Sequence, residues 1–470
     1  MRPLEIALLG ALGAALAAWW AGWPARWLRF WPAAALALLG AHWGLEGYRW
    51  QMLPAYALAG LTGLAALWPA RGRPAPPRVW RRWAGGLAAL LALLLAAAPP
   101  LAFPVPRLPD PGGPYHLGTL SFHWIDTGRR EAYTPAPDDP RELMVQIWYP
   151  AEPPAAGAQP APWMERLEVA GPAIARYLHL PEFILDHTRL IRTHAYPDAP
   201  LSAAEPRYPV LVYSHGWNGF RTINLDEVEA LASRGYVVVT VDHTYGAMLT
   251  VFADGRVIPN RPDALPSDDL PEAEAQPIRE QLVNTYAADL GFVLDQLERL
   301  NAGDLDARFA GRLDLDRVGL FGHSTGGGAV VAVCSRDPRC RAGVGLDAWL
   351  VPVPAADVQA GLTQPFLFMW SAVWSSARND ARFAELVPHL RGDFRSVTIQ
   401  GTRHYDFTLL PLLSPLAPAL GLKGPLEGTR VMRIVDDYLA AFFDQALRGR
   451  PTPLWTAGAA GYPEVIYELP

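Results

Sequence analysis

Four long apolar stretches occupy the first 105 residues, and shorter apolar runs alternate with amphipathic segments after them. The four stretches are Leu4–Trp23, Phe30–Leu45, Gln51–Ala70 and Ala84–Phe103. A helix of roughly 20 residues crosses a hydrocarbon core of about 30 Å, and tryptophans near the ends of the stretches suit the lipid–water interface. We therefore predict a membrane domain of four transmembrane helices in residues 1–105, because a cleaved signal peptide has a single apolar region.

A proline-rich segment at residues 99–114 ends this apolar part and marks a domain boundary. Beyond it the pattern predicts strands near 117–125, 143–149, 208–214, 236–242, 317–321, 342–346, 365–370 and 395–400, and helices at Leu225–Arg234, Pro277–Arg299 and Val431–Leu447. Near-continuous apolar strands separated by helices are typical of a mostly parallel sheet covered on both faces. Residues 106–470 are thus predicted to form an α/β domain.

Two stretches interrupt this alternation, residues 151–200 and residues 246–275. The first contains apolar helical pieces around Trp163–Leu180, and the second is rich in proline and aspartate. Insertions of this size commonly form lids or substrate walls over a scaffold. We expect both to border a binding site.

The charge distribution predicts the orientation of the chain. Residues 1–105 carry nine arginines and two glutamates, a net charge of +7, whereas the whole chain carries −6. The rest is therefore acidic, at −13, which argues against a nucleic-acid partner. The connection ARGRPAPPRVWRRW between the third and fourth stretches holds five arginines and no acid, and such loops stay in the cytoplasm. The fourth helix then delivers residues 106–470 to the extracytoplasmic side.

Three further side chains stand out for their type. Cys334 and Cys340 are the only cysteines; in an oxidising compartment they could close a small disulfide loop, and two free thiols are the equal alternative. His42 falls within the second apolar stretch, where we take it as a tolerated interfacial residue.

A strand that runs directly into a helix carries the strongest chemical signal. The segment RVGLFGHSTGGGAVVAV contains Gly322-His323-Ser324-Thr325-Gly326. Small residues two before and two after the serine permit the tight turn of a nucleophile elbow, which exposes the hydroxyl at the edge of the sheet. Ser324 is therefore the predicted nucleophile.

A serine hydroxyl needs a general base, and in this arrangement the base follows the last strand. His404 lies just after the strand SVTIQ, whereas His389 precedes it in a helical stretch. The orienting acid belongs at the carboxyl end of a strand between serine and histidine, as Asp347 does in AGVGLD. Asp380 is the reserve candidate, and Asp406 is more consistent with a structural role because it shares the histidine's loop.

Ester chemistry also needs hydrogen-bond donors for the oxyanion. The amide of Thr325 follows the nucleophile, and the loop after an early strand, His215-Gly216-Trp217, offers the amide of Trp217. The His215 side chain is expected to pack under that loop rather than to act in catalysis.

Several segments of the chain together resemble the secreted, lipoprotein-associated platelet-activating-factor acetylhydrolases and their bacterial relatives. The segments are GGPYHLGT…RELMVQIWYPAE, YPVLVYSHGWNGFRT…LASRGYVVVTVDH, GHSTGG and GLDAWLVPV, and the spacing to His404 is also similar. The resemblance spans about residues 113–445. It implies an α/β-hydrolase fold, a Ser-His-Asp triad without metal or cofactor, oxyanion amides at Trp217 and Thr325, and hydrolysis of short or oxidised acyl chains from phospholipids. The four amino-terminal helices and the two insertions depart from the family's animal pattern.

We therefore expect a membrane-anchored serine ester hydrolase acting on short-chain or phospholipid-type esters. Its expected partners are a small-molecule or lipid ester substrate and the lipids of the membrane. Alternatives are a lipase or polyester hydrolase, an acyltransferase using the same triad at the outer membrane face, and a non-enzymatic membrane-tethered binding module. The pattern does not determine the oligomeric state.

Overall fold

The computed structural model describes residues 1–67, 79–136, 138–267, 269–374, 376–456 and 461–468. Its contacts divide the chain into two compact units. Unit 1 comprises Met1–Pro106 together with the short segments Phe183–Leu190 and Leu413–Leu416, and unit 2 comprises the remainder.

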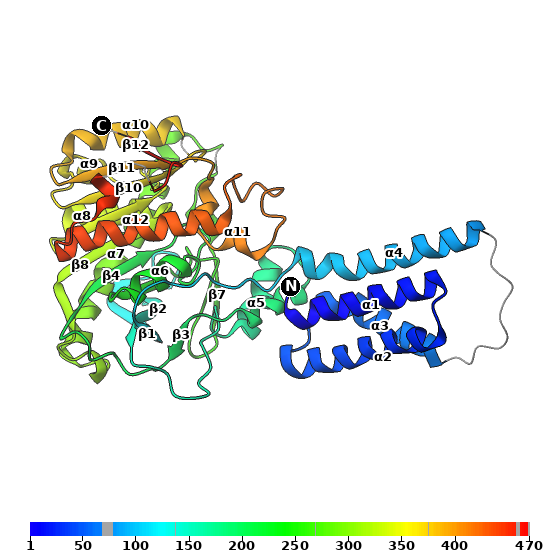
Figure 1. Ribbon diagram of the computed structural model, residues 1–470. Coiled ribbons are helices and arrows are strands. Elements are labelled where there is room, and N and C mark those ends of the chain that lie inside the picture. The colour runs from blue at the N-terminus through cyan, green and yellow to red at the C-terminus, as the bar shows by residue number, and fades with distance from the viewer. Residues whose placement is uncertain (68–78, 137, 268, 375, 457–460, 469–470) are drawn as a thin grey trace. The chain divides into compact units, whose positions relative to one another are not determined.

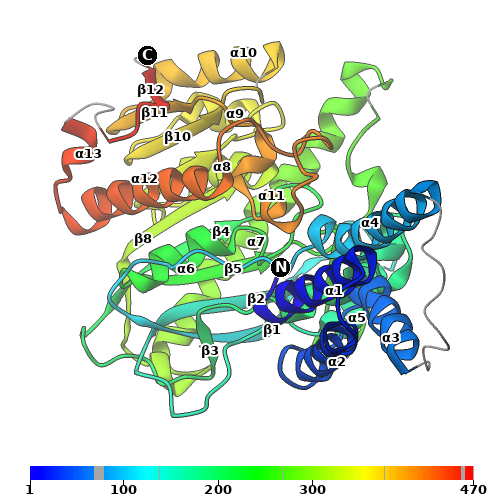
Figure 2. The ribbon, with the colours of Figure 1, turned by 45° about the vertical axis from the view of Figure 1, so that its right-hand side comes forward.

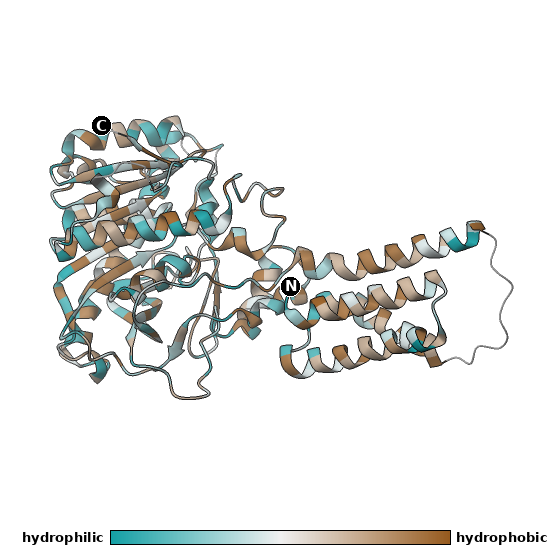
Figure 3. Cartoon of the chain, in the orientation of Figure 1, coloured by the Kyte–Doolittle hydropathy of each residue, from teal (hydrophilic) through white to brown (hydrophobic). Residues whose placement is uncertain are grey.

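Unit 1 contains four helices that lie side by side, as their mutual contacts and Figure 1 show. They are α1 (Pro3–Ala21), α2 (Ala25–Ala41), α3 (Leu53–Leu67) and α4 (Val79–Ala102). Among the described residues two helices, α1 and α4, are long and apolar enough to cross a membrane by length and composition, and their hydrophobic character is visible in Figure 3. The prediction of four transmembrane helices is therefore not supported by the length and composition of the helices. At 17 residues α2 falls short of the roughly 20 that a span needs, and α3 has 15 residues within the described part of the chain.

The second and third apolar stretches are shortened by a change of backbone geometry. The chain after α2 forms a π-helical turn at His42–Glu46, and a 3-10 turn at Trp50–Met52 precedes α3. Most of the arginine-rich connection that predicted the orientation, residues 70–83, lies outside the described residues.

His42 is completely buried in unit 1. It is therefore surrounded by protein side chains, and not placed at a lipid–water interface as expected from the sequence. Its Nε2 atom lies 3.6 Å from Glu5 and 3.9 Å from Glu46, and the three side chains have the spacing of a possible metal site. Arg49 and Arg2 already bind Glu5, at 2.7 and 2.8 Å. Two guanidinium groups thus already balance the charge of this carboxylate.

Unit 2 is built on a ten-stranded mixed sheet with the order β12-β11-β10-β9-β8-β4-β5-β2-β1-β3. The six strands from β11 to β5 run parallel, and β2 and β12 pair antiparallel at either end of them. The strands are β1 (His116–Arg130), β2 (Pro140–Ala151), β3 (Ala195–Pro197), β4 (Tyr208–Ser214), β5 (Val237–Asp242), β8 (Leu313–His323), β9 (Ala342–Leu346), β10 (Phe366–Ser371), β11 (Phe394–Ile399) and β12 (Val465–Glu468). The predicted α/β class is confirmed, and all eight predicted strands belong to this sheet.

Helices pack on both faces of the sheet because its central strands are buried on both sides. On one face α6 (Leu225–Ser233) contacts α12 (Gly428–Arg448), and on the other α7 (Glu272–Ala302) contacts α8 (Thr325–Arg336). Figure 2 shows α6 and α12 together in front of the sheet. The shorter helices α9 (Ala355–Ala360) and α10 (Ala377–Leu386) follow β9 and β10.

The two predicted insertions have their own small elements. The first contains α5 (Leu167–Tyr177) and a 3-10 helix at Glu182–Leu190, and the second contains the two-stranded sheet of β6 (Leu249–Val251) and β7 (Val257–Pro259) followed by a 3-10 turn at Pro262–Ala264. Cys334, near the end of α8, and Cys340, in the loop that follows, form a disulfide with Cα atoms 5.2 Å apart. Of the two states that the sequence left open, the structure has the bridged one.

Candidate active site

Ser324 stands at the turn between β8 and α8. Its backbone has φ 55° and ψ −119°, a conformation that side chains larger than glycine rarely adopt. The turn is tight, because a Cβ atom at Gly326 would lie 2.1 Å from the carbonyl oxygen of Ser214, and one at Gly322 would lie 2.5 Å from the Gly326 backbone. The sequence Gly-His-Ser-Thr-Gly therefore folds as an elbow that holds a strained serine at the start of a helix.

Asp347 follows β9 and is completely buried, also with a positive φ of 43°. Its Oδ1 atom accepts a hydrogen bond from the Ser371 amide at 2.7 Å, and its Oδ2 atom accepts one from the Ser371 hydroxyl at 2.6 Å. Burial raises the pKa of Asp347 to about 7, although the hydrogen bonds from Ser371 act in the opposite direction. Ser371, the last residue of β10, escaped the sequence analysis; its position at a strand end was the available signal.

His404 begins a 3-10 turn, His404–Phe407, in the loop after β11. Its Nδ1 atom lies 3.0 Å from Oδ2 of Asp347, so Nδ1 carries the proton and Nε2 is left as the basic atom. Burial lowers the pKa of the imidazole to about 3, which disfavours the charged form in the unliganded protein.

Two aromatic rings enclose the His404 imidazole, and sequence reasoning identified neither. The Trp374 indole stacks on it with ring centroids 3.7 Å apart and an interplanar angle of 15°. The His323 ring lies on it at 4.4 Å, and its Nε2 atom is 3.1 Å from the His404 carbonyl oxygen. Stacking restricts rotation of the imidazole about its side-chain bonds.

Ser324 and His404 line the same cavity of about 580 Å³. Within the described parts of the chain no hydrogen bond joins the Ser324 hydroxyl to the His404 ring. Such bonds are often long in a site without substrate and tighten when substrate binds. The structure thus brings the three predicted side chains to one edge of the sheet, with the Asp347–His404 contact formed.

Both predicted oxyanion residues, Trp217 and Thr325, border this cavity. Among the hydrogen bonds of the described residues, none uses the Trp217 or the Thr325 amide as donor. Thr325 is the first residue of α8, where an amide has no partner within the helix. Both N–H groups are therefore available to an added acceptor.

The reserve candidates lie elsewhere. Asp380 belongs to the first turn of α10, and His389 ends a 3-10 turn before β11. Asp406 accepts hydrogen bonds from the amides of Arg403 at 2.8 Å and Gly424 at 2.6 Å, which ties its loop together.

Residues of both insertions line the cavity, including Tyr177 and Leu178 from the first and Met248 and Leu265 from the second. The Tyr177 hydroxyl also donates to Asn218 at 3.1 Å, next to the oxyanion loop. Both insertions thus contribute side chains to the wall of this cavity.

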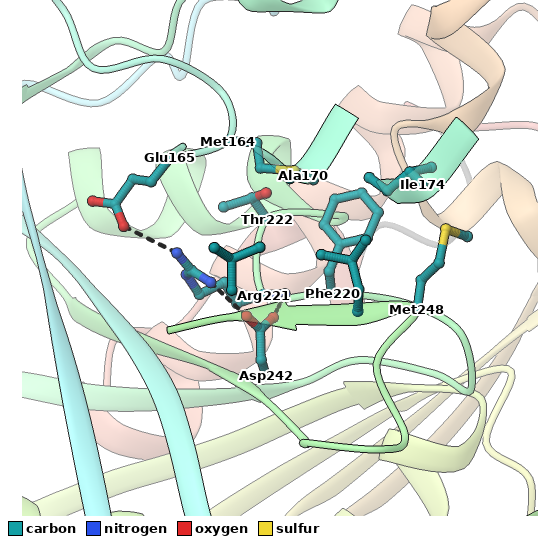
Figure 4. Close-up of a pocket in the computed structure, with 11 residues that line it drawn as sticks. Met164, Glu165, Ala170, Ile174, Phe220, Arg221, Thr222, Asp242 and Met248 are labelled. Atoms are coloured by element: carbon teal, nitrogen blue, oxygen red, sulfur yellow. Dashed lines mark hydrogen bonds and ion pairs between the residues drawn. The ribbon is translucent and has the colours of Figure 1, made fainter. Parts of the chain in front are cut away.

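Arg221 ties the first insertion to the sheet beside a small second cavity (Figure 4). Its guanidinium binds Asp242 at the end of β5 and lies 3.0 Å from Glu165 in the insertion. Its backbone amide donates to Asp242 at 2.6 Å. The apolar side chains Phe220 and Met248 line both this cavity and the one at Ser324.

Comparison with known proteins places the chain in a family. The family model for platelet-activating factor acetylhydrolase, isoform II, matches residues 104–451. The chain belongs to this family. The resemblance seen in the sequence is thereby confirmed.

Relatives of the isoform II family show how far the similarity extends. The platelet-activating factor acetylhydrolase of Cavia porcellus is 27% identical over 271 residues, which cover 55% of this chain and 61% of that protein. A probable 1-alkyl-2-acetylglycerophosphocholine esterase of Arthroderma benhamiae is 24% identical over 428 residues, covering 81% and 98%. The match thus spans about three fifths of the length of the animal protein.

A solved structure shares the fold. The ferulic acid esterase from Streptomyces cinnamoneus superposes with a TM-score of 0.63 at 28% sequence identity, covering 78% of this chain and all of that one. An α/β fold with the sheet and helices of an esterase therefore accounts for unit 2.

Proposed function

We propose that the chain is a serine ester hydrolase in which Ser324 is the nucleophile, His404 the general base and Asp347 the orienting acid. One observation carries the proposal: His404 hydrogen bonds a buried Asp347 at 3.0 Å in a cavity that also exposes a serine with strained backbone. Membership of the isoform II family and the likeness to an esterase support the same chemistry.

The reaction follows from the groups at this edge of the sheet. Nε2 of His404 removes the proton of Ser324 as its oxygen attacks the ester carbonyl, and the imidazolium is stabilised by the Asp347 carboxylate. The same proton then passes to the leaving alcohol, and an acyl-enzyme remains. Water, activated by His404, attacks the acyl-enzyme and releases the acid.

The amides of Trp217 and Thr325 are the proposed donors to the oxyanion. Both belong to residues of the cavity, and both lack a partner among the described residues. The start of α8 adds the partial positive charge of a helix amino terminus, which favours the negative oxygen. A preformed pair of donors stabilises the tetrahedral intermediate more than the planar ester.

The proposed substrates are phospholipid-type esters with short or oxidised acyl chains. The cavity is bounded by aromatic and aliphatic side chains such as Trp349 and Leu410, which suit an acyl group. Relatives named as platelet-activating factor acetylhydrolases support the phospholipid class. We assign the insertions 151–200 and 246–275 as the walls that set acyl length, and residues 106–470 as the catalytic domain.

We also infer that residues 1–105 hold the enzyme at a membrane, with α1 and α4 as spans and the catalytic domain outside the cytoplasm. The Cys334–Cys340 disulfide favours an oxidising compartment. The four-span topology additionally requires α2 and α3 to be extended or the bilayer to thin around them. Alkaline phosphatase fused after residue 110 should be active in cells, whereas activity of a cytoplasmic reporter at that point would refute the orientation.

The catalytic assignment is tested with the full-length chain in detergent micelles. The wild type should hydrolyse p-nitrophenyl acetate and react with a fluorophosphonate probe, and Ser324→Ala should lose both. The matched control is Ser335→Ala on α8, whose hydroxyl only caps the Ala332 carbonyl at 2.9 Å; it should keep both. Hydrolysis that survives Ser324→Ala would refute the nucleophile.

Product analysis separates the alternatives that share the triad. An acyl series from acetate to palmitate, presented on glycerophosphocholine, should show highest kcat/KM for short chains, and a long-chain optimum would indicate a lipase. Transfer to an added alcohol that exceeds hydrolysis would indicate an acyltransferase. A wild type that fails to react with the fluorophosphonate would indicate a binding module.

A further inference from the structure

A second Ser–His–Asp array lies inside unit 2, away from the cavity. The Ser214 hydroxyl is 2.8 Å from Nε2 of His243, and Nδ1 of His243 is 3.0 Å from Oδ2 of Asp289. The three side chains are completely buried, and none of them borders the cavity that Ser324 lines. Since no ester can reach Ser214, the array has a purpose other than nucleophilic attack.

The charge of Asp289 fixes the protons of this array. Arg141, itself buried, donates to both oxygens of Asp289 at 3.0 and 2.5 Å. Burial opposes ionisation of Asp289, but Arg141 and His243 hold the pKa of its carboxyl below the usual range. His243 therefore donates from Nδ1 to a carboxylate, and its Nε2 atom accepts the proton of the Ser214 hydroxyl.

The backbone amide of His243 connects this array to the oxyanion loop. Its amide N–H donates to Nε2 of His215 at 3.1 Å, so the proton of the His215 ring must be on Nδ1. That Nδ1–H donates to the Gly216 carbonyl oxygen at 2.7 Å. The same oxygen accepts a second bond, from the Gly219 amide at 2.9 Å.

The Gly216 carbonyl and the Trp217 N–H belong to one planar trans peptide, in which they point in opposite directions. Fixing the carbonyl with two donors therefore fixes the direction of the N–H. The loop is pressed against the elbow, because a Cβ atom at Gly216 would lie 3.0 Å from the Cβ of Ser324. A small rotation of this peptide would move the Trp217 N–H relative to the nucleophile.

We propose that His215, held by the backbone amide of His243, is a positioning residue that aims the Trp217 N–H at the oxyanion. The inference rests on the proposed hydrolase function and names what prepares its oxyanion site before substrate arrives. His215 touches neither substrate nor the reacting atoms, and it acts by orienting one peptide. Preorganised donors of this kind are typically worth about 100- to 1000-fold in rate.

Three full-length variants test the role of the His215 ring. His215→Phe keeps an aromatic ring beside His243 and Tyr286 but removes the Nδ1–H donor. His215→Asn places an amide N–H near the position of Nδ1 and can restore the bond to Gly216. Tyr286→Phe is the matched control, because the Tyr286 ring packs on His243 at 3.8 Å while its buried hydroxyl has no partner in the described residues.

The measurements are kcat and KM for p-nitrophenyl acetate and the inhibition constant of a trifluoromethyl ketone, which forms an oxyanion when Ser324 adds to it. For His215→Phe we expect kcat/KM to fall about 30- to 100-fold, mainly through kcat, and the inhibition constant to rise by a similar factor. His215→Asn should recover at least about tenfold of both losses. Tyr286→Phe should resemble the wild type.

An inhibition constant that stays unchanged in His215→Phe, or an equal loss in His215→Asn, would overturn the proposal. If His215→Phe does not fold, His215→Gln replaces it, because its amide reaches the Nε2 position and cannot donate to Gly216; full activity in that variant overturns the proposal equally. A wild type that neither hydrolyses the ester nor binds the ketone would instead refute the proposed function.

Discussion

The Ser371 hydroxyl donates to the same oxygen of Asp347, Oδ2, that accepts the hydrogen bond from His404. The Ser371 amide donates to the other oxygen, Oδ1, and both hydrogen bonds act to lower the pKa of this carboxyl against the larger, opposing effect of burial. Ser371 thereby favours the ionised form of Asp347, which the proposed mechanism requires.

This relationship predicts an acid limb in the activity and its displacement. A proton on the Asp347–His404 pair inactivates it wherever it resides, since the base is then either charged or unsupported. Because burial raises the pKa of Asp347 to about 7, kcat/KM should fall as the pH drops through about 7. Removing hydrogen bonds that favour the carboxylate raises its pKa further, so Ser371→Ala should move the limb to higher pH.

The measurement is kcat/KM for p-nitrophenyl acetate between about pH 5 and 9, for the wild type and for each variant. Ser396→Ala serves as the control, because Ser396 is a buried strand serine that accepts a bond from Trp370 at 3.0 Å without touching Asp347. Its limb should coincide with that of the wild type. A shift of the Ser371→Ala limb to lower pH would contradict this account.

The elbow predicts a contrast between two glycines. A methyl group at Gly326 would meet the Ser214 carbonyl oxygen at 2.1 Å, which is backbone and cannot yield easily. Gly326→Ala should therefore destabilise the catalytic unit by about 3 kcal/mol or prevent its folding. Gly291 in α7 has no atom within 4 Å of an added Cβ, so Gly291→Ala should stabilise by roughly 0.5–1 kcal/mol. Thermal unfolding of the two variants checks this, and equal midpoints would contradict it.

The two ion pairs of Arg221, with Asp242 and with Glu165, predict different effects on stability and on substrate binding. Arg221→Met leaves Asp242 buried without its cation, and we expect a loss of about 3–5 kcal/mol in unfolding free energy. Glu165 is the more exposed partner, and Glu165→Gln should change stability little while loosening the insertion that carries Tyr177. The measurement for Glu165→Gln is KM across the acyl series. A large drop in its melting temperature with unaltered KM would refute this division of roles.

The disulfide predicts a modest, redox-dependent stability. Cys334 and Cys340 close a loop of seven residues, for which chain entropy gives roughly 2 kcal/mol. Treatment with dithiothreitol, or the pair Cys334→Ser and Cys340→Ser, should lower the melting temperature by several degrees and leave kcat/KM near the wild-type value. Loss of activity at temperatures where the reduced protein remains folded would show that the loop supports the site.

The sequence was sufficient where local pattern determines structure. Apolar runs located β4, β5, β9, β10 and β11 within one residue but missed the first four residues of β8. The small residues around Ser324 identified the elbow because the turn excludes larger ones. It was not sufficient where pairing is long-range. Ser371, Trp374 and the Asp289–His243 contact depend on which strand ends and helix turns become neighbours. Strands β3 and β12, of three and four residues, carry too little periodicity to be read.

The amino-terminal helices show a different limit. Hydropathy indicated four apolar stretches, but it does not show where the backbone of an apolar stretch changes from α-helix to another conformation. The π-helical turn at His42–Glu46 contributes His42 to a buried cluster, in which His42 lies beside Glu5, 37 positions earlier in the chain, and Arg49 binds the same carboxylate. This contact between residues far apart in the chain lies where α2 ends, and a local hydropathy pattern does not contain it.

The buried Ser214–His243–Asp289 array also bears on how hydrolases are recognised by shape. Its three members satisfy the distance criteria of a charge-relay template more fully than Ser324, His404 and Asp347 do in the unliganded chain. A search that scores interatomic spacing alone would select the inaccessible serine, and a mutagenesis campaign guided by it would begin at the wrong hydroxyl. Backbone strain and solvent access, rather than spacing, distinguish the proposed nucleophile Ser324 from Ser214.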